Sequence, residues 1–503
     1  MKTKNTYILL LTALYFVVSF IGILHHEFFI DEAHHWLLAR DSASVHELFI
    51  NTRIEGHPLI WSLLLYAITR FTTDPFWMQL LHILISTATV VLFLKKAPFS
   101  WLFKILFIFG YFMIFEYNLI SRNYILGVFF LFLACSIFEN RKKRFNWVCI
   151  FLALAANIHL MFSIIAFALF LTLLVENLQK DSFSSRQHLI GYLIFGLGIS
   201  SIIIQIQYTD STWLLDPINA MPIQERLVIG FGSLFKGLVV IPDFRTLYFW
   251  NSNFIVNTCR PLAGVLAILI YFLPLLLFFK NRKTLFFVYT ALVGAQIFFF
   301  ITQRAATRFQ GMTYIIIIMA LWIEKSYDLE TFKLKDFLNR LQLTLWRKPI
   351  IYSILIIQFC SGIYAYTMDY RYPFTSGKET VDFLKKEKLD QKEIVTSTCD
   401  GTILSAYLER KIWFLCDGSY QSFCHWNAGC VEIGKPNMTA EFLINYMNSH
   451  KDAIFVSYYP IAYDLHENIW MPLNRNIRFR LLKKFDLNMV DKTYYYVFEV
   501  SKI

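Results

Sequence analysis

Charged side chains are scarce in this sequence, since Asp, Glu, Lys and Arg make up 17% of its 503 residues. A soluble domain carries roughly 25% charged residues, so this composition excludes an ordinary soluble protein. Glycine and proline are also few, at 19 and 13 residues, which excludes a collagen-like or disordered chain. Eight cysteines in a chain of this length exclude a disulfide-dense miniprotein.

Apolar residues are abundant instead: they make up 56% of the chain, and 51 residues are phenylalanine. They fall in long runs separated by short basic clusters, a pattern typical of bilayer-spanning segments. The sequence therefore predicts a polytopic α-helical membrane protein. The net charge of +11 is explained by Lys and Arg in cytoplasmic loops, so it implies no nucleic-acid partner.

About eleven apolar stretches are dense enough to span the membrane. The first lacks a small-residue cleavage site after Leu24 and is expected to be a retained anchor. The predicted spans are 8–24, 76–94, 101–115, 124–139, 146–158, 160–176, 188–206, 261–279, 284–301, 309–323 and 350–367.

The basic clusters orient these spans, because all of them lie on one side if the N-terminus is cytoplasmic and the spans alternate. Residues 25–75, residues 207–260 and everything after about 370 then lie on the outer face. The apolar stretch His57–Phe71 would break this alternation as a span, so an interfacial helix is expected there, and the loop Gln224–Arg260 is similar. The chain suits a bacterial inner membrane.

The division expected is a transmembrane domain over 1–369 and an outer α/β domain over 370–503, where polar residues return. Its predicted elements are helices near 381–386, 402–409 and 440–449 and strands near 394–398, 411–415, 453–459 and 493–500. Four cysteines lie in this tail, and two readings stay open: one or two disulfides, or four free thiols. Their spacing fits no zinc pattern. They are Cys399, Cys416, Cys424 and Cys430.

Ionisable residues beside apolar spans are costly and mark functional sites. Six of the twelve histidines lie between His25 and His57, and the Asp31-Glu32 pair lies among them. On a helix Asp31, His34 and His35 share one face, where a carboxylate base and imidazoles can act together. A polar cap on the first span is the alternative, and a functional site is favoured over it.

Further polar groups lie at the outer ends of later spans. Glu116 and Arg122 flank one such end and form either a structural ion pair or part of an anionic-substrate site. Arg304 and Arg308 lie four residues apart, which suits phosphate oxygens; snorkelling to headgroups is the alternative. His159 is expected to be a satisfied core histidine.

The order of these motifs resembles the GT-C superfamily of membrane glycosyltransferases, which includes protein O-mannosyltransferases and lipid A aminoarabinose transferases. The motifs are Asp31-Glu32 after the first span, Glu55-Gly56-His57-Pro58, Glu116-Tyr117 and Arg122-Asn123-Tyr124. The resemblance covers residues 1–367 and lies in order and topology rather than in any single motif. It implies that Asp31 is the catalytic base or lies beside a metal and the acceptor, and it matches the His57-Pro58 step. The His34-His35 pair is outside the family pattern, and Gln303–Arg308 matches it only in kind.

The function expected is inverting transfer of a sugar from a polyprenyl-phosphate donor to a hydroxyl of a glycan, lipid or protein acceptor at the outer face. Catalysis is expected from Asp31 and Glu32, and a divalent metal such as Mg²⁺ or Mn²⁺ from Asp31 and Glu116. The residues expected to bind substrate are His35, His57, Glu116, Arg122, Arg304 and Arg308.

Three other functional classes are alternatives for a sequence with these features. A transporter or flippase of lipid-linked sugars uses similar arginines and aromatics, but it should show repeated halves, and no internal repeat is visible. A polymerase or ligase of surface glycans does not call for an acidic pair after the first span. A non-catalytic scaffold is the least compatible with charge in the membrane.

Overall fold

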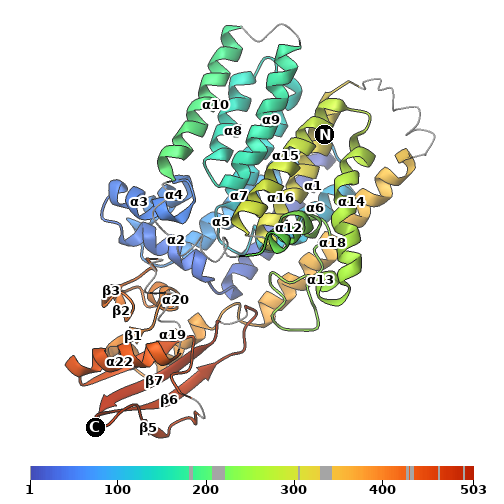
Figure 1. Ribbon diagram of the computed structural model, residues 1–503. Helices are drawn as coiled ribbons and strands as arrows, with labels where there is room; N and C mark the ends of the chain where they lie inside the picture. The colour runs from blue at the N-terminus through green and yellow to red at the C-terminus, as the bar shows by residue number, and fades with distance from the viewer. Residues whose placement is uncertain are drawn as a thin grey trace.

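The computed structural model describes residues 2–179, 185–206, 221–303, 306–328, 343–425, 430, 436–462, 465–490 and 493–503. A bundle of helices is followed in the chain by a sheet domain at one end of the molecule (Figure 1). The N-terminus lies at the opposite end of the bundle from this domain, and the C-terminus lies within it (Figure 1). The expected helical membrane protein with a C-terminal α/β domain is confirmed.

Each of the eleven predicted spans contains an α-helix. Seven of the described helices are long and apolar enough to cross a membrane: α1 (Lys2–His25), α5 (Phe76–Lys96), α9 (Leu160–Leu178), α10 (Arg186–Gln205), α14 (Arg260–Phe278), α15 (Arg282–Thr302) and α18 (Leu343–Arg371). The other four are shorter: α6 (Trp101–Ile108), α7 (Tyr124–Ile137), α8 (Phe145–Ala156) and α16 (Thr307–Ile323). Helix α16 lies deep in the bundle, since nearly all of its side chains are buried.

The predicted span at 101–115 is interrupted. Helix α6 ends at Ile108, and a wider π-helical turn, η2 (Phe112–Glu116), follows. Helix α18 crosses this break closely: a Cβ atom on Gly362 would lie 2.7 Å from the Phe109 carbonyl oxygen, so only glycine fits there. The break matters for the site, because π-helical turns re-aim side chains and Glu116 ends this one.

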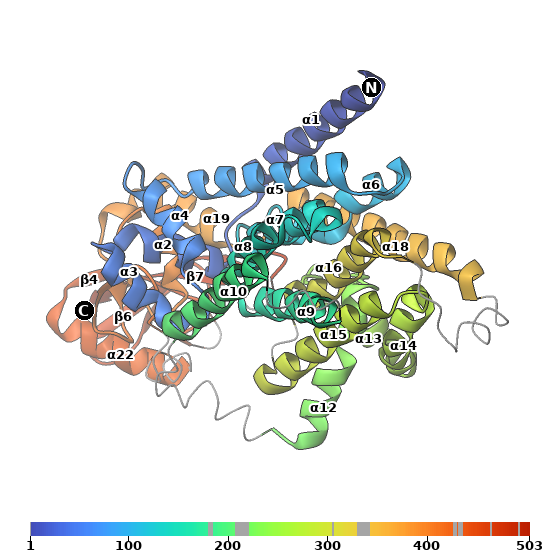
Figure 2. The same ribbon diagram turned by 90° about the horizontal axis from the view of Figure 1, so that it is seen from above.

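Short helices occur in the two long loops that were expected on the outer face, residues 25–75 and the described part of 207–260. The first loop holds α2 (Ile30–Asp41), α3 (Val45–Thr52), the 3₁₀ turn η1 (Arg53–Glu55) and α4 (Ile60–Thr69), and the second holds α12 (Ile223–Gly232), η4 (Leu234–Gly237) and α13 (Phe254–Thr258). Helix α4 is the helix expected over His57–Phe71; Trp61 and Leu65 are buried and Leu63 and Leu64 are exposed. Viewed from above, α2, α3 and α4 overlie the sheet domain at one side of the bundle (Figure 2).

The C-terminal domain contains a seven-stranded sheet in the order β3-β2-β1-β4-β7-β6-β5. Strand β1 is parallel to β2 and β4, and the other pairs are antiparallel. The strands are β1 (Ile394–Thr396), β2 (Ile412–Phe414), β3 (Ser419–Gln421), β4 (Asp452–Ser457), β5 (Trp470–Pro472), β6 (Ile477–Phe485) and β7 (Tyr495–Lys502), and the helices are α19 (Gly377–Lys386), α20 (Gly401–Tyr407) and α22 (Pro436–Ser449). All seven predicted elements are present, whereas β3, β5 and β6 were not predicted.

Two disulfides, Cys399–Cys424 and Cys416–Cys430, settle the open question about the cysteines of the tail. The domain also contacts the first long loop (residues 25–75), because α20 packs on α2. Phe28 is central to this junction: its amide donates to the Tyr407 hydroxyl at 2.9 Å and its carbonyl accepts from Thr375 at 2.9 Å. The sheet domain thus supports the loop that carries the acidic pair.

Candidate active site

Asp31 and two arginines meet near the N-terminal ends of α2, α7 and α16. The Asp31 carboxylate lies 2.7 Å from the Arg122 guanidinium and 3.3 Å from that of Arg308. Asp31 belongs to the first turn of α2, Arg122 to the turn before α7, and Arg308 to the first turn of α16. Three segments far apart in the sequence therefore supply one ionic cluster.

The cluster is largely enclosed: the side chains of Arg122, Arg308 and Asp31 are 5%, 17% and 20% exposed. Burial alone would raise the pKa of Asp31, but the charges of Arg122 and Arg308 outweigh it and hold this pKa below its ordinary value of 3.8. Asp31 is therefore ionised at neutral pH.

The turn that carries Arg122 is held through its backbone. The buried ring of His82, from the middle of α5, places one nitrogen 2.9 Å from the Asn118 carbonyl oxygen and the other 2.8 Å from that of Arg122. The guanidinium carbon of Arg122 also lies 5.2 Å from the centre of the Tyr124 ring. Sequence reasoning did not single out His82, although an imidazole within an apolar span is itself a signal of function.

Arg308 is fixed by neighbours from two other segments. The Tyr117 hydroxyl donates to the Arg308 carbonyl oxygen at 2.6 Å. The guanidinium carbon lies 5.6 Å from the Trp250 ring and 5.1 Å from the Phe309 ring, within range of cation–π attraction. Arg304, the other arginine expected here, lies outside the described residues.

Glu116 lies behind the cluster and is 1% exposed. Its carboxylate accepts hydrogen bonds from the Tyr111 hydroxyl and the Trp250 indole, both at 3.1 Å. Trp250 belongs to the second long loop (residues 207–260), and the next residue, Asn251, accepts from the Thr307 amide at 3.1 Å. Glu116 therefore anchors that loop at the start of α16, next to Arg308.

Glu32 points away from its neighbour Asp31 and is fully buried. It accepts from the amides of Phe29 and Ser121 and lies 3.3 Å from a ring nitrogen of His26. The two members of the acidic pair thus occupy different surroundings: Asp31 borders the ionic cluster, and Glu32 lies in the protein interior.

Histidines extend the site away from Asp31. A ring nitrogen of His34 lies 2.7 Å from a carboxylate oxygen of Glu55, within hydrogen-bond distance. The His35 and His57 rings lie 5.6 Å apart, and those of His57 and His159 lie 4.7 Å apart. His159 also accepts from the Met161 amide and caps α9, in agreement with the satisfied histidine expected there. Burial lowers the pKa of His35 to about 4, so this imidazole is neutral at pH 7.

The expected divalent metal at Asp31 and Glu116 does not fit these contacts. Two guanidiniums contact the Oδ2 atom of Asp31 and place positive charge where a cation would have to bind, and the Tyr111 hydroxyl and the Trp250 indole both donate to the Oε2 atom of Glu116. Among the described residues, potential metal ligands converge only at Cys416, Asp417 and Cys430, and the two cysteines form a disulfide.

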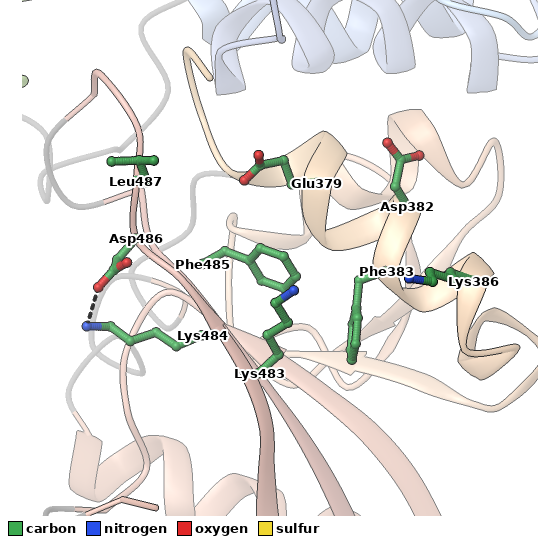
Figure 3. Close-up of a pocket in the computed structure, with 9 residues that line it drawn as sticks. All are labelled: Glu379, Asp382, Phe383, Lys386, Lys483, Lys484, Phe485, Asp486 and Leu487. Carbon is green, nitrogen blue, oxygen red and sulfur yellow. Dashed lines mark ion pairs between the residues drawn. The ribbon is translucent and has the colours of Figure 1, made fainter. Parts of the chain in front are cut away.

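A separate cleft of about 440 Å³ lies on the C-terminal domain, between α19 and the end of β6 (Figure 3). The Lys483 ammonium lies 5.4 Å from the Phe383 ring and 5.0 Å from the Phe485 ring, and Lys484 pairs with Asp486. The charges of this cleft are neutralised within it or exposed to solvent. It is therefore distinct from the enclosed cluster around Asp31.

No family model and no curated protein matches the chain. Among solved structures it is similar to ArnT from Cupriavidus metallidurans in the apo state, with 9% sequence identity and a TM-score of 0.45. The similarity covers 99% of this chain and 98% of that chain. At this identity and score, the functional conclusion has to come from the contacts of the site itself.

Proposed function

We propose that the protein is an inverting glycosyltransferase, which moves a sugar from a polyprenyl-phosphate donor to an acceptor hydroxyl at the outer face of the membrane. The observation that carries the proposal is the carboxylate of Asp31 held between Arg122 and Arg308. A base and two phosphate-binding cations, enclosed beside the membrane, are what transfer from a phosphate leaving group requires.

Arg122 and Arg308 bind the phosphate of the donor. Their guanidiniums present planar sets of donors that match phosphate oxygens, and the phosphate gains negative charge as its bond to the sugar breaks. The same interaction is therefore stronger in the transition state than in the bound donor, which is the requirement for catalysis. The phosphate needs no general acid, because it leaves as an anion.

Asp31 takes the proton of the acceptor hydroxyl as that oxygen attacks the anomeric carbon. In the free protein the arginines hold the pKa of Asp31 low, so it is a weak base. When the donor phosphate engages those arginines, their effect on Asp31 falls and its basicity rises. Attack opposite the phosphate inverts the configuration at the anomeric carbon.

Other groups of the site support donor binding. His35 is buried, and its Nδ1 atom has no hydrogen-bond partner among the described residues. The buried hydroxyl of Tyr124 likewise has no partner among them. Such groups leave hydrogen bonds to be made by a sugar. Together with His57, they form the sugar-facing side in this proposal, and the surrounding rings exclude water that would hydrolyse the donor.

An apolar groove of about 340 Å³ between η4, α14 and α18 supports a lipid donor. Its lining is hydrocarbon and aromatic throughout and includes Val239, Ile270 and Ile354. The Val239 carbonyl accepts from Asn253, in the same outer loop as Trp250, so the groove adjoins the loop that reaches the site. A polyprenyl tail fits this lining.

The test is donor turnover by the wild type and by Asp31→Asn in nanodiscs. Each protein is incubated with polyprenyl-phosphate sugars and envelope acceptors, and released polyprenyl phosphate is measured by mass spectrometry. Release by the wild type and its loss in a folded Asp31→Asn protein are expected. Donor that both proteins bind but never cleave would overturn the proposal in favour of a transporter or flippase.

A further inference from the structure

Glu32 divides its two carboxylate oxygens between separate segments of the chain. One oxygen accepts from the Phe29 amide at 2.9 Å and closes the first turn of α2, and the other accepts from the Ser121 amide. Asp31 and Arg122 are the adjacent residues in those two segments, and they form the ion pair of the site. The contact between residues 32 and 121 therefore joins the same two segments as the contact between residues 31 and 122, one residue away in each.

The His26 ring links Glu32 to Asp369. One nitrogen of its ring lies 3.3 Å from Glu32, and the other lies 3.0 Å from both oxygens of Asp369, in the last turn of α18. Burial alone would lower the pKa of His26, but Asp369 and Glu32 raise it to about 10. The ring is therefore an imidazolium, which donates a hydrogen bond to each carboxylate.

These three side chains do not reach the ionic cluster. Glu32, Asp369 and His26 are 0%, 2% and 3% exposed. A substrate at Asp31 cannot touch them without unfolding this region, and an ionised carboxylate persists in such surroundings only when it is paired. Their contacts fix where backbone segments lie.

We propose that Glu32 and His26 are positioning residues, which set the separation of Asp31 and Arg122 by joining the start of α2, the turn before α7 and the end of α18. His82 adds to this arrangement, because its two ring nitrogens lie within hydrogen-bond distance of the Asn118 and Arg122 carbonyl oxygens. The inference rests on the proposed function, and it moves Glu32 from a second catalytic group to a structural partner of the first.

The length of the side chain at position 32 separates positioning from base catalysis. Glu32→Gln keeps the reach and a carbonyl oxygen for the Ser121 amide; it loses the charge, and its NH₂ group cannot accept from the Phe29 amide. Glu32→Asp keeps the carboxylate but is too short to reach both amides. A positioning role predicts more turnover in Glu32→Gln than in Glu32→Asp, by about tenfold, whereas a catalytic base predicts the opposite order.

Hydrogen exchange gives a readout that does not need turnover. In Glu32→Asp and in His26→Ala, the Ser121 and Arg122 amides are expected to exchange faster and the affinity for polyprenyl phosphate to fall. The matched control is Glu176→Gln, which disrupts the buried Arg141–Glu176 ion pair (2.9 Å), formed by residues just beyond α7 and near the end of α9. It should lower the unfolding temperature similarly and change neither readout.

The outcomes separate the two proposals. Faster exchange at Ser121 without any turnover by the wild type would keep the structural link and reject the glycosyltransferase. Two results would overturn the positioning role. One is turnover that is higher in Glu32→Asp than in Glu32→Gln. The other is a rate of amide exchange at Ser121 that equals the wild-type rate in both Glu32→Asp and His26→Ala.

Discussion

The indole of Trp250 donates a hydrogen bond to the buried carboxylate of Glu116 at 3.1 Å and thereby ties the second long loop to the C-terminal end of the broken helix α6–η2. The same indole ring lies beside the Arg308 guanidinium. One side chain therefore links the loop, the buried acid and a proposed phosphate ligand.

Replacing Trp250 by phenylalanine should loosen this link. The change keeps an aromatic ring but leaves Glu116 with one fewer donor, and a buried polar group that loses its partner costs about 1–3 kcal/mol. We expect water to enter the site, so that the ratio of donor hydrolysis to sugar transfer rises. Both products can be measured in one assay with labelled donor.

The control for this experiment is Trp77→Phe, because Trp77 is 48% exposed on α5. It should leave the ratio unchanged. An unchanged ratio in Trp250→Phe as well would show that the indole is not needed to exclude water.

The two arginines of the cluster should not be replaceable by lysine. Lysine keeps the charge but presents a point donor, so it loses the paired contacts that guanidinium makes with phosphate oxygens. Arg122→Lys and Arg308→Lys should each lower kcat by about 10²–10³-fold, as removal of one transition-state donor does. Steady-state kinetics with saturating acceptor measure the effect.

Arg260→Lys serves as the control, since Arg260 is exposed at the start of α14. It should retain wild-type kinetics. Full activity in Arg308→Lys would place the phosphate elsewhere.

Titration of Asp31 or His35 should not change kcat/KM between pH 5 and pH 8. The kinetic parameter kcat/KM reports the free protein, in which the pKa of Asp31 lies below 3.8 and that of His35 is about 4. Because a lowered carboxyl pKa means that the charged form is lost only at lower pH, the acid limb of Asp31 should fall below pH 3.8.

In Arg308→Gln one of the cations that lower this pKa is missing, so the acid limb should move to higher pH. The position of the limb is measured with donor and acceptor well below their KM. An acid limb that is identical in the wild type and the variant would show that Arg308 does not act on the base.

Much of the fold could be predicted, because the spans and the α/β tail follow from hydrophobic runs and alternating patterns. Strand β6 was not predicted from the sequence, because four basic residues obscure the alternation of its buried positions: Arg478, Arg480, Lys483 and Lys484. The break between α6 and η2 was not predicted either, because it depends on the close crossing of α18, which is a tertiary contact.

The candidate site was partly predictable for a related reason. Asp31, Arg122 and Arg308 stand out as charges beside apolar spans. The same rule applies to His82 and Asp369, which lie within α5 and α18, but their partners lie in other helices and no spacing in the sequence reveals them. The separate surroundings of Asp31 and Glu32 also depend on tertiary contacts, although the residues are adjacent.

Chelation of divalent metals should leave donor turnover unchanged. In a metal-dependent transferase the cation neutralises the leaving phosphate, whereas here two guanidiniums already contact one oxygen of the carboxylate that would have to bind it. We expect equal kcat with excess EDTA and with added Mg²⁺ or Mn²⁺, measured after dialysis of the protein in nanodiscs. Loss of turnover with EDTA, restored by one of these ions, would contradict the arginine mechanism, because the cation would then have to displace Arg122 or Arg308 from Asp31 when the donor binds.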